Sequence, residues 1–273
     1  MTISFKYLLI TALFFCISAP LFSRSVNVGV KTVVIDPGHG GRDPGTVGKH
    51  IKEKDIVLSI ALRFGQLVEE WFPDVRVLYT RKTDVFVDLY KRGEFANENS
   101  ADIFISIHAN SIDASEEERN ATSGNETWIM GMHRSEENLR VAMMENRVIQ
   151  TEDRYEENYG GFDPTEPESY IVFSLIQDVY MEQSLRMAEY IQNEMQNGPV
   201  RRNRGVKQAG YVVLWKTAAP SVLIETGFVS NPKEEKILMD ANNQQQIAEC
   251  IFRAFQRYKN DMDRIVYSYG DDK

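Results

Sequence analysis

The sequence predicts an α/β fold: a single twisted, mostly parallel β-sheet flanked by helices on both faces, with a helical insertion. Short runs that are apolar throughout, such as residues 33–36 and 102–107, are typical of strands buried on both faces. Longer segments between these runs repeat apolar residues at helical spacing, and strands that alternate with helices form parallel sheets. The length of 273 residues, of which 42% are hydrophobic and 26% charged, suits one globular domain.

Each expected element has a local reason. The strand at 33–36 ends at the turn-forming run PGHGG, and the helix at 53–71 carries apolar residues at every third or fourth position. The helix at 135–150 begins at Ser135, a good N-cap, and has two glutamates in its first turn, where acids suit the helix dipole. The same patterns predict further strands at 75–79, 127–130, 211–214 and 222–225, and further helices at 87–99, 169–195 and 244–258.

The first 25 residues are predicted to be a secretory signal peptide. A positively charged start with Lys6 precedes an apolar run at 7–16, and small residues follow, so cleavage is expected near Ser23 or Ser25. The apolar run is short for a membrane span, which disfavours the alternative of an uncleaved anchor. A lipid anchor on Cys16 is a second alternative, disfavoured by the bulky phenylalanine before it.

Charge and cysteine content exclude some function classes. The formal net charge of −9 makes nucleic acid a poor partner, because phosphate binding needs a positive surface. After signal cleavage only Cys250 remains, so the exported chain has no internal disulfide. Its neighbours Ile247, Ile251 and Phe255 indicate that the thiol is buried, which a bacterial periplasm tolerates.

Residues 136–168 are unusually acidic, with ten acids against three arginines. The later part of this stretch carries glycines and prolines typical of a loop. The segment 135–168 therefore has the character of an insertion on a compact fold.

Two histidines follow predicted strands directly. His39 comes after the strand at 33–36 and His108 after the strand at 102–107, and the carboxyl ends of strands are where sites form in open α/β sheets. Glu53 opens the helix that follows the first strand. Two histidines and a glutamate form a ligand set that suits one catalytic zinc ion. Glu225, at the end of the strand at 222–225, is the candidate general base and acid. Each of the four alone has an ordinary structural explanation; the combination indicates a site.

The chain resembles the zinc-dependent N-acetylmuramoyl-L-alanine amidases of bacterial cell walls. The resemblance extends from about residue 32 to about residue 255. It is carried by an ordered set of motifs: VIDPGHGG at 34–41 with DPG at 43–45 and Glu53, TR at 80–81, SIHAN at 106–110, ET at 126–127, VKQA at 206–209 and PSVLIETGF at 220–228.

The resemblance implies one zinc ion held by His39, Glu53 and His108, and Glu225 as the catalytic residue. The implied reaction is hydrolysis of the amide between N-acetylmuramic acid and L-alanine in peptidoglycan, by a catalytic domain over residues 26–261 followed by a polar tail at 262–273. Glu225 would take a proton from the attacking water and return it to the departing nitrogen.

Three further residues are weaker candidates. Asp36 is expected either to orient a ligand histidine or to cap a turn, and Asn110 and Lys207 are expected to touch substrate.

Some members of this family that act in cell division carry a helical insertion over the zinc cleft, which an activator protein displaces. The resemblance therefore predicts that the segment 135–168 is an inhibitory lid. Its candidates to reach the zinc or a nearby basic group are Glu152, Asp153, Glu156 and Glu157. A solvated acidic face is the alternative for the same residues.

Other functions remain open at this stage. They are a catalytically silent peptidoglycan-binding or regulatory domain, and another zinc peptidase of the cell wall. The expected location is the periplasm, or otherwise the medium or cell surface, with no stable membrane anchor once the signal is removed.

Overall fold

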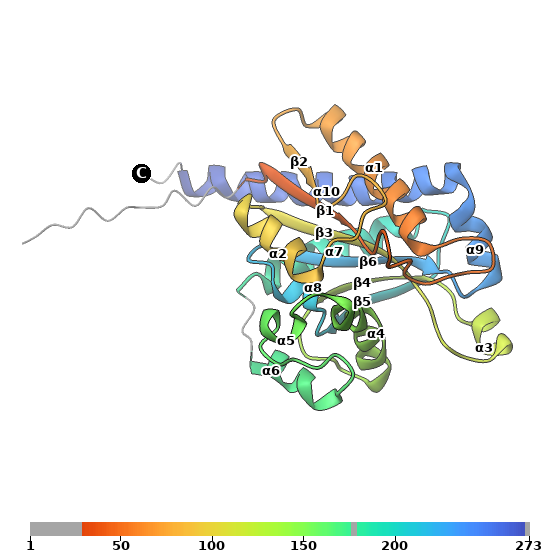
Figure 1. Cartoon of the computed structure of the whole chain (residues 1–273). Helices are drawn as coiled ribbons and strands as arrows, with labels where there is room; N and C mark the ends of the chain where they lie inside the picture. The colour runs from red at the N-terminus through yellow and green to blue at the C-terminus, as the bar shows by residue number, and fades with distance from the viewer. Residues whose placement is uncertain (1–28, 176–178, 271–273) are drawn as a thin grey trace, which may run out of the picture.

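The computed structural model describes residues 29–175 and 179–270, and its centre is one six-stranded sheet (Figure 1). The strand order is β2-β1-β3-β6-β4-β5. The pairs β1–β2, β1–β3, β3–β6 and β4–β5 are parallel, and β4–β6 is antiparallel. The predicted single, mostly parallel sheet is confirmed. The strands are β1 (Thr32–Pro37), β2 (Arg76–Tyr79), β3 (Ile103–Asn110), β4 (Asn125–Met130), β5 (Asn203–Ala209) and β6 (Ser221–Phe228).

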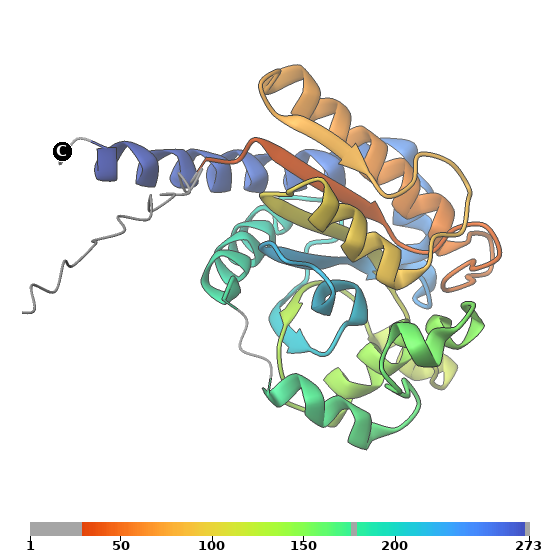
Figure 2. The same ribbon diagram turned by 60° about the vertical axis from the view of Figure 1, so that its left-hand side comes forward.

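Helices cover both faces of the sheet, as the apolar strands predict. Helices α1 (Glu53–Trp71), α7 (Met181–Met195) and α10 (Ala241–Gly270) pack on one face. Helices α2 (Leu89–Glu98), α4 (Glu136–Asn146) and α8 (Val212–Trp215) pack on the other. Every residue of β1, β3 and β6 is buried, and successive side chains enter the two cores alternately. Figures 1 and 2 show α1 and α10 on the side of the sheet opposite α4.

Two strand predictions differ from the structure. The apolar run at 211–214 lies in α8 rather than in a strand, because a run of four apolar residues fits a buried helix turn as well as a strand. Strand β5 was not predicted, since its edge position lets it carry polar residues such as Arg204, Lys207 and Gln208.

Helix boundaries also differ from the predictions. The long helix predicted at 169–195 is divided among the 3-10 helix η2 (Pro167–Ile171), α6 (Val172–Leu175) and α7, and residues 176–178 lie outside the described residues. The predicted polar tail from 262 continues α10 as far as Gly270. Short helices α3 (Glu116–Ala121) and α9 (Pro232–Met239) were not predicted.

The insertion is packed against the sheet and is not a solvated arm. The packed segment extends beyond the predicted end at 168, to residue 175: it comprises α4, the 3-10 helix η1 (Arg147–Thr151), α5 (Tyr155–Asn158), η2 and α6, which lie together below the sheet in Figure 2. Its aromatic residues Tyr159, Phe162, Tyr170 and Phe173 are buried in one core with the sheet residue Trp128. The acidic side chains lie mainly on the outer surface, so the segment has both an apolar inner face and a charged outer face.

The predicted signal peptide and Cys16 lie outside the described residues. Within residues 29–175 and 179–270, no helix combines the length and apolar character needed to cross a membrane. Cys250 is a free, buried thiol, as predicted.

A buried ion pair joins β1 to α2. Asp36 accepts hydrogen bonds from Thr80 Oγ1 at 2.6 Å, Ser106 Oγ at 2.7 Å and Arg92 Nη1 at 2.8 Å. Burial opposes ionisation of this carboxyl, but Arg92 and the three hydrogen bonds outweigh burial and hold its pKa below the usual value. The ionised carboxylate therefore stabilises the fold.

We expect Asp36→Asn to lower the free energy of unfolding by about 3 kcal/mol at pH 7, because the change leaves the buried Arg92 uncompensated. The folded pKa of Asp36 is depressed, so its contribution is complete above the unfolded pKa of 3.8 and is lost as the pH falls through the folded pKa. In urea unfolding, the stabilities of the two proteins should therefore differ at pH 7, and the difference should decrease as the pH falls below 3.8 and through the folded pKa. Asp74→Asn, which weakens an exposed pair, should change stability by less than about 1 kcal/mol. Equal stability of Asp36→Asn and the parent at pH 7 contradicts this account.

Candidate metal centre

The structure brings His39, Glu53 and His108 together at the carboxyl edge of the sheet. His39 lies in the turn after β1, Glu53 is the first residue of α1, and His108 lies near the end of β3. The Oε1 atom of Glu53 is 3.0 Å from His39 Nε2 and 3.2 Å from His108 Nδ1. The three residues that sequence analysis proposed as metal ligands therefore converge on one point.

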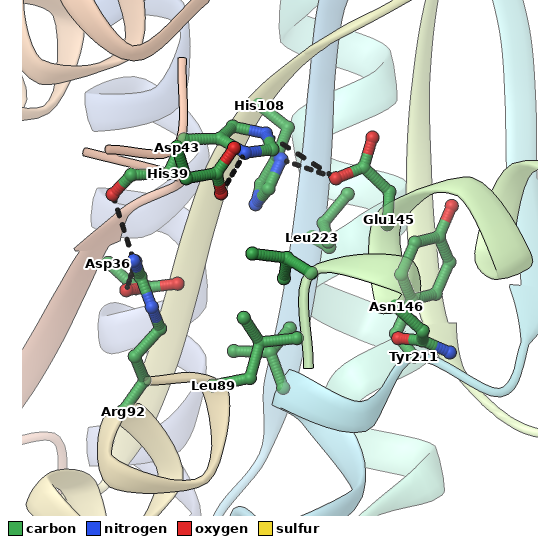
Figure 3. A pocket seen from close by; sticks show the side chains of 12 residues that line it. Asp36, His39, Asp43, Leu89, Arg92, His108, Glu145, Asn146, Tyr211 and Leu223 are labelled. Carbon is green, nitrogen blue, oxygen red and sulfur yellow. Dashed lines mark hydrogen bonds and ion pairs between the residues drawn. The ribbon is translucent and has the colours of Figure 1, made fainter. Parts of the chain in front are cut away.

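A fourth side chain, Glu145, completes this group from the insertion. Its Oε2 atom is 3.4 Å from His39 Nε2 and 3.2 Å from His108 Nδ1 (Figure 3). The four ligand atoms lie within 4.8 Å of one another, and all four residues are buried. The cavity beside them is only about 20 Å³, room for a single water molecule.

The hydrogen bonding around the group fits a metal ion. His39 Nδ1 lies 2.8 Å from Asp43 Oδ2, so Nδ1 carries the proton and the lone pair of Nε2 faces the other ligands. Within the described residues, His39 Nε2, His108 Nδ1 and Glu145 Oε2 are buried and have no hydrogen-bond partner. Two imidazole nitrogens and two carboxylate oxygens are ligand types that could hold a metal ion such as zinc.

Local backbone features hold Glu53 and His108 in place. The amides of Ala109 and Thr46 donate to the two oxygens of Glu53 at 2.9 and 2.8 Å, which fixes the carboxylate plane. A Cβ atom on Gly38 would lie 2.4 Å from the His108 ring, and one on Gly45 would lie 2.6 Å from Glu53 Oε2. The glycines of the PGHGG and DPG motifs thus make room for the ligands.

Glu225 lies on β6 beside the metal ligands. It is the register partner of His108 on β3, so the two side chains emerge on the same face of the sheet. It is fully buried, and within the described residues neither carboxyl oxygen has a hydrogen-bond partner. Burial, together with the nearby carboxylates of Glu145, Glu53 and Glu126, raises its pKa well above the usual value. A buried carboxyl beside the ligand group, with no other partner among the described residues, is a candidate for general acid and base work.

The three weaker candidates lie near the group without joining it. Asp36 contacts Arg92 rather than a histidine, and Asp43 takes the expected orienting role on His39. Asn110 Nδ2 and Lys207 Nζ both donate to Glu126, at 3.4 and 2.9 Å. Asp43 was not among the predicted site residues, although it stands in the DPG motif four residues after His39.

The four acids expected to reach the metal lie elsewhere. Glu152 accepts hydrogen bonds from the Leu89 amide at 2.7 Å and from Tyr159 Oη at 2.6 Å. Asp153, Glu156 and Glu157 are exposed. The contact with the histidines is made by Glu145 instead, seven residues before Glu152, which corrects the expectation.

A helical pattern could have identified Glu145. The buried residues of α4 are Asn138, Ala142, Glu145 and Asn146, which share one helix face. An acid on the buried face of an amphipathic helix needs a partner, whereas the acids after residue 151 follow the end of that helix.

This constellation on an α/β sheet has the character of a hydrolase site that could hold a metal ion. Residues 33–257 match the family described as N-acetylmuramoyl-L-alanine amidase, and the chain belongs to that family. It is 33% identical over 226 residues to the amidase AmiA of Escherichia coli K12, covering 82% of this chain and 74% of the relative. It is 31% identical over 235 residues to the amidase AmiC of Escherichia coli O6:H1, covering 83% of this chain but only 52% of that relative.

Solved structures agree with this assignment. An N-acetylmuramoyl-L-alanine amidase from Clostridium difficile 630 superposes with a TM-score of 0.63 at 26% identity, covering 85% of this chain and 98% of that one. The CwlD amidase from Clostridioides difficile, solved in complex with the GerS lipoprotein, superposes with a TM-score of 0.60 at 27% identity, covering 84% and 98%.

We expect His108→Ala to lose most of its bound zinc, because it removes one of the two nitrogen ligands. The parent chain should retain about one zinc ion per molecule after gel filtration, as measured by atomic emission. His50→Ala, which changes an exposed histidine, is the matched control and should keep the metal. Equal zinc content in His108→Ala and the parent would remove His108 from the ligand set.

Proposed function

We propose that this chain is a zinc-dependent hydrolase of the amide between N-acetylmuramic acid and L-alanine in peptidoglycan, and that Glu145 inhibits it. The observation that carries the proposal is the group of four ligand atoms. Three of its residues belong to the sheet and its adjoining elements, and the fourth belongs to the insertion.

The roles of the residues follow from their positions. His39, Glu53 and His108 hold the zinc, and Asp43 keeps the His39 ring in the tautomer that presents Nε2. When bound, zinc polarises the amide carbonyl and lowers the pKa of a neighbouring water. Glu225 accepts the proton of the attacking water and passes it to the departing nitrogen. Neither oxygen of its buried carboxyl has a hydrogen-bond partner among the described residues, so both are available to carry that proton.

Glu145 keeps this site closed. The cavity of about 20 Å³ beside the ligands is far too small for a sugar–peptide substrate, since ligand pockets measure roughly 300 Å³ or more. A hollow of about 620 Å³ lies outside it and is lined by His39, Gly45, Met144 and Glu145. Movement of α4 would join this hollow to the metal and free the position that Glu145 fills.

We further propose that an activator protein moves α4 and that the chain is exported. A structural relative was solved with a lipoprotein bound, which supports a protein partner for this fold. The segment 1–25 has the charge and apolar pattern of a signal peptide. The periplasm is the proposed location, with the medium or cell surface as the alternative.

Digestion of purified peptidoglycan by residues 26–273 tests the activity. We expect free stem peptides that begin at L-alanine, identified by mass, which disappear with a chelator and return with zinc. Fragments cut within the peptide would instead identify a zinc peptidase. No products, from a Glu145→Ala variant that binds zinc, would favour a peptidoglycan-binding domain.

We expect Glu225→Gln to lower kcat by about 10²-fold to 10⁴-fold, because it removes the group that transfers the proton. Its zinc content should equal that of the parent, since Glu225 is outside the group of four. Product release measured by mass spectrometry checks the rate. Retention of more than a tenth of the activity would show that another residue transfers the proton.

We expect Glu145→Ala to raise basal activity by about tenfold or more, because even 1.4 kcal/mol of lost closed-state stabilisation shifts the equilibrium tenfold. Glu136→Gln, an exposed acid on the same helix, is the control and should leave the activity unchanged. Lower activity in a folded, zinc-loaded Glu145→Ala chain would show that Glu145 supports the reaction instead of blocking it.

A further inference from the structure

A row of charged and polar side chains crosses the sheet from the metal centre to its far edge. His108 on β3 and Glu225 on β6 are register partners, and Glu225 is in turn the partner of Glu126 on β4. Lys207 on β5 pairs in register with Trp128, two residues from Glu126 along β4. Because register partners share a face, all four charged side chains lie on the face that α4 covers.

Two cations meet at the far end of this row. Arg204 Nε donates to Glu126 Oε1, and Lys207 Nζ donates to the same atom at 2.9 Å. Glu126 is 1% exposed, and the Arg204 and Lys207 side chains are 18% and 16% exposed. One buried carboxylate therefore faces two partly buried cations, which leaves one positive charge to be balanced.

Helix α4 supplies the balancing charge through Glu137. Its Oε1 atom lies 2.9 Å from Arg204 Nη2 and 3.8 Å from Lys207 Nζ. Glu137 and Glu145 stand on the same helix, eight residues apart. A rigid displacement of α4 away from the sheet would withdraw Glu145 from the histidines and Glu137 from the two cations together.

The spacing of the two sites suits an extended peptide. Eight residues of α-helix correspond to about 12 Å, which separates the two contacts made by α4. Across the sheet, the charged groups of both cations contact Glu126 on β4, and β4 lies two strand spacings from β3, or about 10 Å. An extended peptide spans about 3.3–3.6 Å per residue, so the cations lie roughly three residues from the metal.

We propose that Arg204 and Lys207 form a binding site for a carboxylate on the second or third residue of the stem peptide, which Glu137 occupies while the lid is closed. This inference rests on the proposed function, and it assigns a substrate class: peptides with a free acid near the cut amide. Arg204 lies over the Phe228 ring at 5.3 Å and Lys207 over the Trp128 ring at 5.1 Å, which holds both cations in place. In the closed lid, Glu145 at the metal site and Glu137 at the cations then occupy the positions of two substrate groups.

Two matched peptides test the proposal. One is an N-acetylmuramoyl-L-alanyl tripeptide with free carboxylates on its second and third residues, and the other carries amides there. Binding is measured by calorimetry with the zinc-loaded double variant Glu145→Ala/Glu225→Gln, and cleavage with Glu145→Ala. We expect the free acid to bind at least about tenfold more tightly, the usual scale for a charged hydrogen bond.

Variants at each end of the contact separate a binding role from a structural one. Adding Lys207→Met should reduce the preference for the free acid to about twofold, whereas Lys233→Met, at an exposed lysine, should leave it unchanged. In a chain with Glu145 intact, Glu137→Gln should raise the affinity for the free acid, and Glu136→Gln should not. If Lys207→Met weakens both peptides equally, the cations only neutralise Glu126 and the proposal is wrong.

The outcomes distinguish this inference from the proposed function. Cleavage of both peptides with equal efficiency and equal binding supports the amidase but overturns the carboxylate site. Preferential binding of the free acid without cleavage of either peptide overturns the amidase and supports the site. If neither peptide binds to the zinc-loaded double variant, the carboxylate site is overturned, whatever the cleavage assay shows.

Discussion

The convergence of two carboxylates on two imidazoles, away from water, is the constraint on which the rest of the structure depends. Burial lowers the pKa of His108, but the carboxylates of Glu145 and Glu53 outweigh burial and raise it to about 10. The group therefore requires positive charge at its centre, whether from protons or from a metal ion. The zinc ion of the proposed function would supply that charge and leave both imidazoles neutral. Binding of a cation would offset the free energy that it costs to bury the Glu53 and Glu145 carboxylates.

The fold meets this constraint at backbone positions near the ligands where only glycine fits without a clash. Gly38 and Gly45 stand so close to the ligands that side chains there would displace them. Arg92, fixed by Asp36, also donates to the His39 carbonyl at 2.8 Å, so α2 supports the histidine turn from beneath. The ion pair in the core and the ligand set at the sheet edge are parts of one connected structure, which explains why the VIDPGHGG motif carries both.

The features of the fold and site that could be predicted from sequence are those that depend on local sequence patterns. The parallel sheet and the grouping of His39, Glu53 and His108 follow from strand ends and a helix start. Glu145 was missed because its role depends on which face of α4 packs inward. That face is held by Asn146, whose Nδ2 donates hydrogen bonds to Tyr170 Oη and to the Gly210 carbonyl on distant segments. Strand β5 was missed because an edge strand needs no apolar alternation. The role of Arg204 and Lys207 on β5 depends on their ion pairs with Glu126, which lies about 80 residues earlier in the sequence.

The packing of the insertion determines how it can open. Its aromatic residues form one core with the sheet, and Asn146 Oδ1 accepts a hydrogen bond from the Val212 amide at 2.9 Å, so displacement of the whole segment would expose a large apolar surface. Helix α4 is tied to the sheet by ionic contacts at Glu137 and Glu145 and by the buried Asn146, whose Nδ2 donates to Tyr170 Oη and to the Gly210 carbonyl. Because Glu145 and Asn146 are neighbours on the helix, a shift of α4 that frees the metal site disturbs both sets of contacts. On the proposed function, regulation of this site is a competition between acids of the lid and groups of the substrate for the same positive charges.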